Sequence, residues 1–147
     1  MNVRLEPVTR DNWEEVIKID LAPEQWANVD PPSVLHALCE GQFWPTLHSY
    51  AIMNGDTMVG FINYGLGASG KSWVVAILII DKHHQRKGYG RAAMERVIER
   101  ARAEASAGAS LLISYRPNNV AAERLYTSLG FKPEGELEGD VLAWLRF

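Results

Sequence analysis

The sequence lacks several features that would assign it to a whole class of proteins. It has one cysteine, Cys39, which cannot form an internal disulfide and has no metal-ligand spacing around it, so we expect no metal site. No apolar run approaches the roughly 20 residues that cross a bilayer, and the first residues, Met-Asn-Val-Arg-Leu-Glu, lack the apolar core of a signal peptide. The net charge of -3 lacks the basic surplus typical of nucleic-acid binding. These absences predict a cytoplasmic protein that binds neither membrane nor nucleic acid.

The composition is that of an ordinary globular protein. Hydrophobic residues make up 47% of the chain and charged residues 22%. A length of 147 residues is enough for one domain with a substantial core. We therefore expect residues 1–147 to form a single domain.

An uncharged run from Val74 to Ile80 is short, rich in branched side chains and followed by polar residues. This pattern is typical of a strand buried on both faces, at the centre of a sheet. Gly88 and Gly90 then mark the start of a helix, whose N-terminus offers unpaired N–H groups and the positive end of the helix dipole. The turn predicts an anion site, most naturally for a phosphate, with donors and charge from Gln85, Arg86, Lys87 and Arg91. The alternative is a tight turn with a solvated basic edge, because two glycines alone are weak evidence.

Upstream of this strand, the patterns predict strands at 3–8, 49–53 and 58–64 and helices at 9–21 and 33–40. Asn54-Gly55 predicts a β-hairpin, whose second strand then pairs with the central one. Pro23 would end the first helix, and Asp30 would cap the second. The segment 24–30 either lines a pocket or forms a capped loop with Trp26 in the core. The apolar face of the second helix would consist of Val34, Leu35, Leu38 and Cys39.

Residues Gly65 to Ser72 match the Walker A pattern, which suggests a nucleotide-binding phosphotransferase. A P-loop needs a helix directly after its Lys-Ser pair, so that the helix N-terminus faces the phosphates. Here the strand pattern Trp-Val-Val-Ala-Ile-Leu-Ile-Ile follows instead. We therefore interpret 65–72 as a turn between two strands and keep the phosphotransferase as an alternative.

Downstream, an amphipathic helix from Ala92 to Arg102 leads to a strand at 111–115, which the strand-helix-strand order makes parallel to the central strand. Asn119 is placed to cap a helix at 120–129. Gly130 would end that helix. A sixth strand from Phe131 and a seventh at 141–147 would form a final hairpin.

Two blocks of this sequence follow recognisable spacings. Gln85-x-x-Gly88-x-Gly90 stands between a hydrophobic strand and an amphipathic helix, and Asn119-Val-Ala-Ala122-Glu-Arg-Leu125-Tyr126-Thr-Ser-Leu-Gly130-Phe131 comes later. In this order they resemble the motifs of the GNAT N-acetyltransferase superfamily. The resemblance implies an α/β fold with a mixed sheet of about seven strands, parallel splayed strands 4 and 5, and about four flanking helices. It implies acetyl-CoA as the cofactor, bound by Leu78, Ile79, Ile80, Gln85, Arg86, Lys87, Gly88, Tyr89, Gly90, Arg91, Asn119 and Tyr126.

The resemblance also implies a mechanism. Tyr126 matches the family tyrosine and would donate a proton to the leaving CoA sulfur, with an N–H near Ile79 stabilising the oxyanion. No Cys or Ser matches a nucleophile position, so the acetyl group would pass directly to the amine. An alkyl ammonium has a pKa of about 10.4, so forming the free amine at pH 7 costs roughly 4 to 5 kcal/mol and requires a base or a water path. The candidates for this base, among which we make no assignment, are Glu24, Asp30, Glu40, His83 and His84.

Within the superfamily, the chain resembles bacterial spermine/spermidine (diamine) acetyltransferases. The acceptor would then be a small-molecule amine, with Gln25, Trp26, Asp30 and Tyr64 as candidate ligands, and the protein could be a homodimer. The acidic residue that this subgroup carries on the fourth strand is Ala76 or a neighbour here. Other primary amines, including aminoglycosides, amino acids and protein N-termini, stay open. A catalytically silent CoA-binding sensor is a further alternative.

Overall fold

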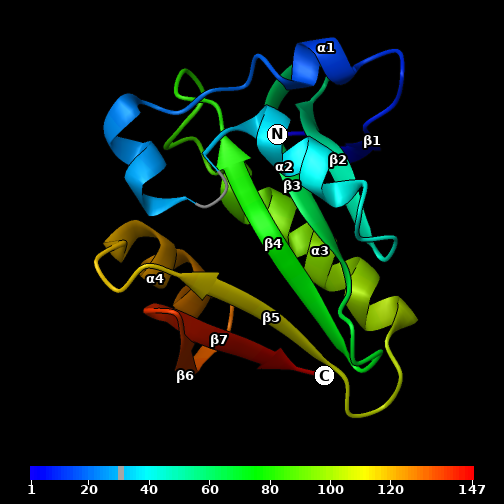
Figure 1. Ribbon diagram of the computed structural model, residues 1–147, viewed down its shortest axis with the longest axis vertical. Helices are drawn as coiled ribbons and strands as arrows, with labels where there is room; N and C mark the ends of the chain where they lie inside the picture. Colours follow the sequence, from blue (N-terminus) through cyan, green and yellow to red (C-terminus); the bar gives the residue numbers. More distant parts are fainter. Residues whose placement is uncertain (30–31) are drawn as a thin grey trace.

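The computed structural model describes residues 1–29 and 32–147, which form one mixed sheet with helices on both faces (Figure 1). The sheet order is β1-β2-β3-β4-β5-β7-β6, so β4 lies in the middle. This confirms the predicted fold class. The strands are β1 (Val3–Pro7), β2 (Leu47–Asn54), β3 (Thr57–Leu66), β4 (Ser72–Ile80), β5 (Ser110–Tyr115), β6 (Lys132–Leu137) and β7 (Asp140–Arg146). The helices are α1 (Trp13–Val16), the 3-10 helix η1 (Pro23–Asn28), α2 (Val34–Gly41), α3 (Tyr89–Glu104) and α4 (Val120–Ser128).

The hairpin of β2 and β3 confirms the turn predicted at Asn54-Gly55. Asn54 pairs with Thr57, and Gly55 has a φ of 58°, a left-handed conformation that glycine adopts without strain. β3 in turn pairs antiparallel with β4, as predicted. The hairpin therefore brings β3 against the strand that carries the predicted site.

β4 contains a β-bulge that changes which side chains face which helices. Asn63 of β3 pairs with Ile77, but its neighbour Tyr64 pairs with Val75, so Ala76 is an extra residue without a partner in the ladder. Because of this extra residue, Val75 packs in the core under α3 while Ile77 packs in the core under α2. Ala76 itself is exposed. The prediction that this strand is buried on both faces was therefore wrong at Ala76.

β4 and β5 run parallel but pair only at one end. The ladder joins Ser72–Val74 to Ser110–Leu112, and beyond it the two strands diverge. Figure 1 shows the resulting wedge between the green and the yellow strand. The predicted splay of strands 4 and 5 is confirmed, and the β5 side of β4 from 75 to 80 is left open.

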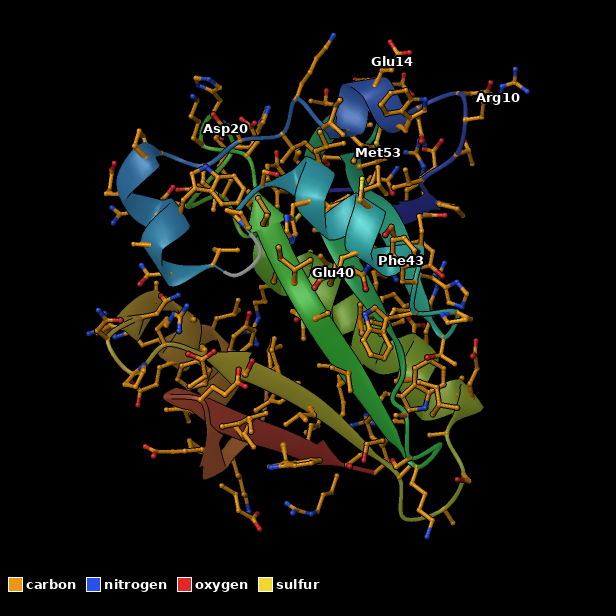
Figure 2. All side chains as sticks on the ribbon, viewed as in Figure 1. Arg10, Glu14, Asp20, Glu40, Phe43 and Met53 are labelled. Carbon is orange, nitrogen blue, oxygen red and sulfur yellow. The ribbon has the colours of Figure 1, made fainter. Side chains whose placement is uncertain are left out.

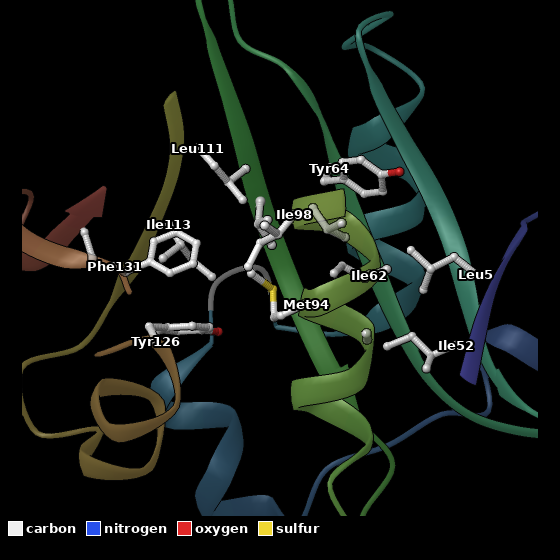
Figure 3. Close-up of a cluster of buried hydrophobic side chains, with 14 of the residues drawn as sticks. Leu5, Ile52, Ile62, Tyr64, Met94, Ile98, Leu111, Ile113, Tyr126 and Phe131 are labelled. Carbon is white, nitrogen blue, oxygen red and sulfur yellow. The ribbon is translucent and has the colours of Figure 1, made fainter. Parts of the chain in front are cut away.

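Two hydrophobic cores hold the layers together. One lies between the sheet and α3 and α4, and Figure 3 shows part of it, with Tyr126 and Phe131 beside Ile113 of β5 and Met94 of α3 nearby. The other lies under α1 and α2 and includes Val16, Val34, Phe61, Ile77 and Ile79. The sheet is thus covered on both faces. In the described ranges, every helix is too short or too polar to traverse a lipid bilayer.

The first two helices differ from the predicted ones. α1 covers only 13–16 instead of 9–21. Before it, the Asn12 side chain bonds to the preceding segment, since its Oδ1 accepts from the N–H of Thr9 at 2.7 Å and its Nδ2 donates to a backbone carbonyl. After it, the N–H groups of Lys18 and Ile19 donate to carbonyls three residues earlier, so the α-helical pattern ends. Pro23, expected to end a helix, begins η1 instead. Proline suits that position because the N–H it lacks would be unpaired in the first turn.

The third helix, α2, begins after Ser33, whose hydroxyl accepts a hydrogen bond from a first-turn N–H at 3.0 Å. Ser33 and not Asp30 is therefore the cap, and Asp30 itself lies outside the described residues. The predicted apolar face is also narrower. Two side chains are buried, Val34 and Ala37, and Leu38 is partly buried, whereas two of the predicted ones are exposed, Leu35 and Cys39.

The C-terminal part follows the prediction closely. Asn119 caps α4, since its Oδ1 accepts from the N–H of Ala122 at 3.2 Å. Gly130, with a φ of 96°, follows the end of the helix. β6 and β7 form the predicted hairpin, although β6 starts at Lys132, one residue later than expected.

Candidate functional site

The loop between β4 and α3 presents a row of backbone N–H groups. Arg86 has a φ of 62° and Gly88 a φ of 85°, and left-handed residues in such a turn make a concave set of donors for an anion. Among the hydrogen bonds of residues 1–29 and 32–147, none uses the N–H groups of 86–91, whereas the N–H of Ala92 donates to the Gly88 carbonyl at 3.0 Å. The positive end of the α3 dipole adds to these donors. The loop therefore has the geometry of a phosphate site.

Two polar side chains hold this loop in place. Asp81 accepts from the N–H of His83 at 2.9 Å and from the N–H of Asp20 at 3.0 Å. The Gln85 side chain donates to the Ile80 carbonyl at 3.0 Å and exchanges hydrogen bonds with the Gln25 amide at 2.9 and 3.0 Å. In this structure the Gln85 side chain thus braces the loop, and its contribution to a ligand would come through that bracing.

The other residues predicted around the loop take different roles. Arg86 and Lys87 are exposed, with their charges beside the free N–H groups. Arg91 pairs with Glu95 at 3.2 Å and donates to Ser128 of α4 at 2.7 Å. Tyr89 points its hydroxyl toward β2, where it accepts from Asn54 at 3.0 Å. Tyr89 can therefore meet a loop ligand through its backbone N–H, not through its hydroxyl.

The register of β4 decides which of its backbone groups face the opening. The N–H of Asp81 donates to Val59 of β3 at 2.9 Å, and the ladder continues with Ile80 opposite Gly60. In an antiparallel ladder alternate residues bond to the same neighbour, so Ile79 bonds to β3 while Leu78 and Ile80 face the β5 side. The N–H of Ile79 itself is therefore turned away from the opening, and the oxyanion donor predicted near Ile79 would be one of its two neighbours. The free N–H groups at this edge belong to Leu78 and Ile80.

A cavity of about 110 Å³ occupies the opening between β4 and β5. It lies along the free edge of β4 and ends at α4. Its walls include Ala76 and Leu78 of β4, Ile113 and Tyr115 of β5, Asn28 and Val29 at the end of η1, and Asn119 and Tyr126 of α4. The structure therefore brings two predicted residues of the second motif, Asn119 and Tyr126, to the predicted edge of β4.

Tyr126 stands in apolar surroundings at this cavity. Its ring lies 5.9 Å from the rings of both Tyr115 and Phe131, and only 7% of the residue is exposed (Figure 3). Burial raises the pKa of Tyr126 well above its ordinary value. No hydrogen bond within the described ranges engages its hydroxyl group. The side chain is thus a neutral phenol whose proton is available to a ligand.

The residues predicted to bind the acceptor do not gather at this cavity. Gln25 is engaged by Gln85 and by the N–H of Ala22 at 3.1 Å. Trp26 donates its ring N–H to Asp20 at 3.0 Å, and this hydrogen bond is the main cause of the lowered pKa of the Asp20 carboxyl. From the same segment, Asn28 and Val29 line the cavity instead. Asp30 falls outside the described residues.

Tyr64 lies on the other face of the sheet, under α3. Its ring stacks on Tyr50 at 5.2 Å, and its hydroxyl accepts from Arg100 at 3.1 Å. Burial raises the pKa of Tyr64. This side chain therefore belongs to the core packing under α3 and does not reach the opening.

The residues predicted as candidate general bases lie in different parts of the structure. His83 is exposed, and His84 packs edge-on against Tyr89 with ring centroids 6.4 Å apart. Glu24 is exposed on η1. Of the candidates within 1–29 and 32–147, Glu40 alone lines a cavity that borders β4, and Figure 2 shows its side chain over that strand.

One polar residue at this second cavity was missed by the sequence analysis. Asn63 of β3 is 3% exposed, and its Oδ1 has no hydrogen-bond partner among the described residues. The signal was present in the sequence, because Asn63 is a polar residue inside an otherwise apolar strand pattern. A buried polar side chain at such a position calls for a partner.

The Walker A-like segment forms the predicted turn. β3 ends at Leu66 and β4 starts at Ser72, so a strand and not a helix follows Lys71. Gly70, with a φ of 72°, donates to the Gly67 carbonyl at 3.0 Å within the turn. The nine residues of β4 place this turn roughly 30 Å from the 81–88 loop. The segment lacks the helix dipole that a P-loop uses.

The sheet opens between β4 and β5, beside the loop at the N-terminus of α3 whose N–H groups suit a phosphate. An extended thioester that carries a phosphate would bind along this opening, with its reactive end at the buried phenol of Tyr126. This is the architecture of a CoA-dependent acyltransferase. Residues 13–131 match the family model described as "Acetyltransferase (GNAT) family", and the chain belongs to that family. It is therefore an acetyltransferase of the family that the two motifs resemble.

Known proteins resemble the chain over nearly its full length. It is 30% identical over 146 residues to a protein of Bacillus subtilis subsp. natto (strain BEST195) named "Probable spermine N(1)-acetyltransferase", covering 94% of this chain and 93% of that one. An acetyltransferase from Thermus thermophilus has a TM-score of 0.75 at 21% identity, covering 100% and 98%. Spermidine N-acetyltransferase from Vibrio cholerae, solved with CoA and spermine, has a TM-score of 0.76 at 14% identity, covering 99% and 95%. These two structures share the fold described above.

Proposed function

We propose that this protein transfers the acetyl group of acetyl-CoA directly to a primary amine of a small molecule, with a polyamine or diamine as the favoured acceptor. The observation that carries the proposal is the arrangement of three features: the free N–H groups of 86–91 follow the end of β4, the β5 side of β4 is unpaired beyond Val74, and the cavity along that side is lined by Tyr126. Each part of acetyl-CoA finds a complementary group in this arrangement.

The diphosphate fits the loop. Its charge would be met by the N–H groups of 86–91, the α3 dipole and the exposed Arg86 and Lys87. The pantetheine amides would then bond to Leu78 and Ile80, which face the opening as an unpaired strand edge does. Asn119 would add its Nδ2, since its Oδ1 is already used in capping α4.

The transfer needs three groups beside the thioester. The amine nitrogen attacks the carbonyl carbon, and the N–H of Leu78 is the nearest candidate to bind the resulting oxyanion. The carbon-sulfur bond then breaks, and Tyr126 donates its proton to the sulfur. The proton of the attacking amine leaves through a base, for which Glu40 is the best placed of the described candidates.

Two observations favour a polyamine as the acceptor: the name of a relative and the negative charge beside β4. The Bacillus subtilis relative is named for spermine, and a polyamine is a polycation that acidic side chains attract. Glu40 provides such a side chain beside β4, where Ala76 carries none. Gln25, Trp26 and Asp30 stay predictions as acceptor ligands, whereas the position of Tyr64 under α3 does not favour it.

A thiol-release screen tests the proposal. Purified protein with acetyl-CoA is mixed with spermine, spermidine, putrescine, an aminoglycoside, amino acids and a peptide with a free N-terminus. We expect thiol release that depends on the amine and is fastest with the polyamines. Acetyl-CoA binding without release with any amine would instead support the CoA-binding sensor, and ATP turnover would support the phosphotransferase. A homodimer stays a prediction, which analytical ultracentrifugation would test.

A further inference from the structure

A cavity of about 300 Å³ lies on the α3 face of the sheet, at the opposite end of β4 from the loop at 81–88. It lies between the last turns of α3, the start of β2, the end of β3 and the start of β4. None of the described residues around it lines the opening between β4 and β5. Arg100 and Glu104 of α3 and His48 of β2 are exposed, so solvent reaches the cavity. The other walls used below are Tyr50, Tyr64 and Trp73.

Arg100 is held at this cavity without a carboxylate partner. Its guanidinium carbon lies 5.3 Å from the centre of the Tyr50 ring, and its Nη1 donates to the Tyr64 hydroxyl at 3.1 Å. Two other arginines of α3, Arg91 and Arg96, pair with glutamates at 3.2 and 3.3 Å. No ion pair within the described part of the chain includes Arg100. Because a guanidinium has several N–H donors and is fixed here over a ring, its remaining donors suit a carboxylate.

Glu104 places the opposite charge at the same cavity, one helical turn after Arg100. Side chains four residues apart on a helix are neighbours, with about 5 to 6 Å between their Cβ atoms. Among residues 1–29 and 32–147, Glu104 also forms no ion pair. An anion alone would be repelled by Glu104, and a cation alone would be repelled by Arg100. A ligand with a carboxylate and an ammonium group on neighbouring atoms meets both charges favourably, and an α-amino acid is such a ligand.

Three aromatic rings form the apolar part of the cavity. Tyr50 and Tyr64 stack on the α3 face with their centroids 5.2 Å apart, and Trp73 of β4 lines the same cavity (Figure 3). At about 30 Å³ for each water-sized group, 300 Å³ holds about ten non-hydrogen atoms. Leucine has this size, whereas a dipeptide is larger. The interior therefore favours a single amino acid with an apolar side chain.

We propose that this cavity binds a free α-amino acid with an apolar side chain, at a site separate from that of acetyl transfer. The carboxylate bonds to Arg100, the ammonium group to Glu104, and the side chain lies against the three aromatic rings. Trp73 belongs to the short ladder that joins β4 to β5, so the bound amino acid contacts the closed end of the opening. The proposal does not depend on the identity of the amine that accepts the acetyl group.

Three ligands and two pairs of variants test the proposal. Leucine, isocaproate and isoamylamine share one apolar group and carry both charges, the carboxylate alone and the ammonium alone. Their binding is measured by calorimetry on CoA-saturated protein. Arg100→Gln and Glu104→Gln each remove one charge from the cavity. The controls are Arg102→Gln, whose guanidinium lies 5.5 Å from the centre of the Phe147 ring, and Glu99→Gln, since both belong to α3 and neither lines this cavity.

We expect leucine to bind wild type about tenfold or more tightly than either single-charge ligand, because each of those lacks one charged hydrogen-bonding group. Arg100→Gln should weaken leucine binding by about tenfold or more and Glu104→Gln by several-fold, whereas both controls should bind like wild type. Arg100→Gln also removes the partner of the buried Tyr64 hydroxyl, so Glu104→Gln and the three ligands decide the result if that variant does not fold.

Leucine that does not bind, or that binds no more tightly than isocaproate and isoamylamine, would overturn the proposal. Leucine that is acetylated, and that binds Glu104→Gln as tightly as wild type, would also overturn it, because leucine would then occupy the acceptor site. Thiol release with the best amine should be the same in Glu104→Gln as in wild type, and a loss would overturn the separation of the two sites.

Discussion

Tyr126→Phe is the most direct test of the chemistry, because it removes one hydroxyl and nothing else. That hydroxyl has no partner within the described residues, so its removal leaves no other group unpaired. The free energy of unfolding should therefore change by less than about 1 kcal/mol. Acetyl-CoA should bind with nearly unchanged affinity, since the residues proposed to bind its diphosphate and pantetheine groups are other ones.

The expected loss in turnover follows from the leaving thiol. A free thiol has a pKa of about 8.5, so expelling it as a thiolate at pH 7 costs about 2 kcal/mol more than expelling it protonated. Burial keeps the pKa of Tyr126 raised, so the phenol stays protonated throughout the neutral range. We expect kcat of Tyr126→Phe to fall about 30-fold at pH 7, and the deficit to shrink as the pH approaches about 8.5.

The assay is steady-state thiol release from pH 6.5 to 9 at saturating acetyl-CoA, with the best amine from the screen. Tyr50→Phe, which removes a hydroxyl under α3 outside the opening, is the control. A kcat ratio between wild type and Tyr126→Phe that is close to one at pH 7 would remove Tyr126 from the mechanism. A ratio that is large but independent of pH would show that the phenol acts in some way other than protonating the sulfur.

Four further results are expected. Gly88→Ala places a side chain at a φ of 85°, so the KM for acetyl-CoA should rise about tenfold with little change in kcat at saturation. Gln85→Ala removes the hydrogen bond to the Ile80 carbonyl, and urea denaturation should show a loss of about 1 to 2 kcal/mol in the free energy of unfolding. Lys71→Ala should leave the affinity for acetyl-CoA unchanged in calorimetry, and a drop would point to the Walker-like turn. Because the pKa of Tyr126 is raised by folding, the unfolded chain loses this proton first as the pH rises, so the free energy of unfolding should fall above pH about 10, and less steeply in Tyr126→Phe.

The sequence predicted the elements whose signals are local. Asn54-Gly55 specifies its hairpin because few other residues accept the backbone that the turn needs, and the run from Val74 to Ile80 specifies a strand through its side chains alone. The turn at the start of α3 was predicted in the same way, from its glycines, and its role as an anion site stays a prediction. Tyr126 required the spacing of a second motif, since nothing about an isolated tyrosine separates a proton donor from a core residue.

The features that escaped prediction depend on pairing across the sheet. The exposure of Ala76 follows from the bulge opposite Asn63 and Tyr64. The sequence of one strand does not specify its register with the neighbouring strand, so this bulge could not be predicted. For the same reason, the sequence could not specify which N–H near Ile79 is free, since the ladder with β3 engages that of Ile79 itself. The first helix was overextended because the pattern from 9 to 21 gave no sign that Asn12 would bond back to the preceding strand.

The divergence of β4 and β5 has a mechanical consequence. Past the short ladder at Ser72–Val74, no strand pairing among the described residues fixes the distance between β4 and β5, so the helices beneath them act as the spacer. A Cβ added at Gly90 of α3 would lie 3.9 Å from Leu125 of α4, and the hydrogen bond from Arg91 to Ser128 ties the two helices together. A larger side chain at these contacts would change the width of the opening between β4 and β5 without touching acetyl-CoA or the amine. We therefore expect substitutions at the contacts between α3 and α4 to change the catalytic rate, although these residues touch neither reactant.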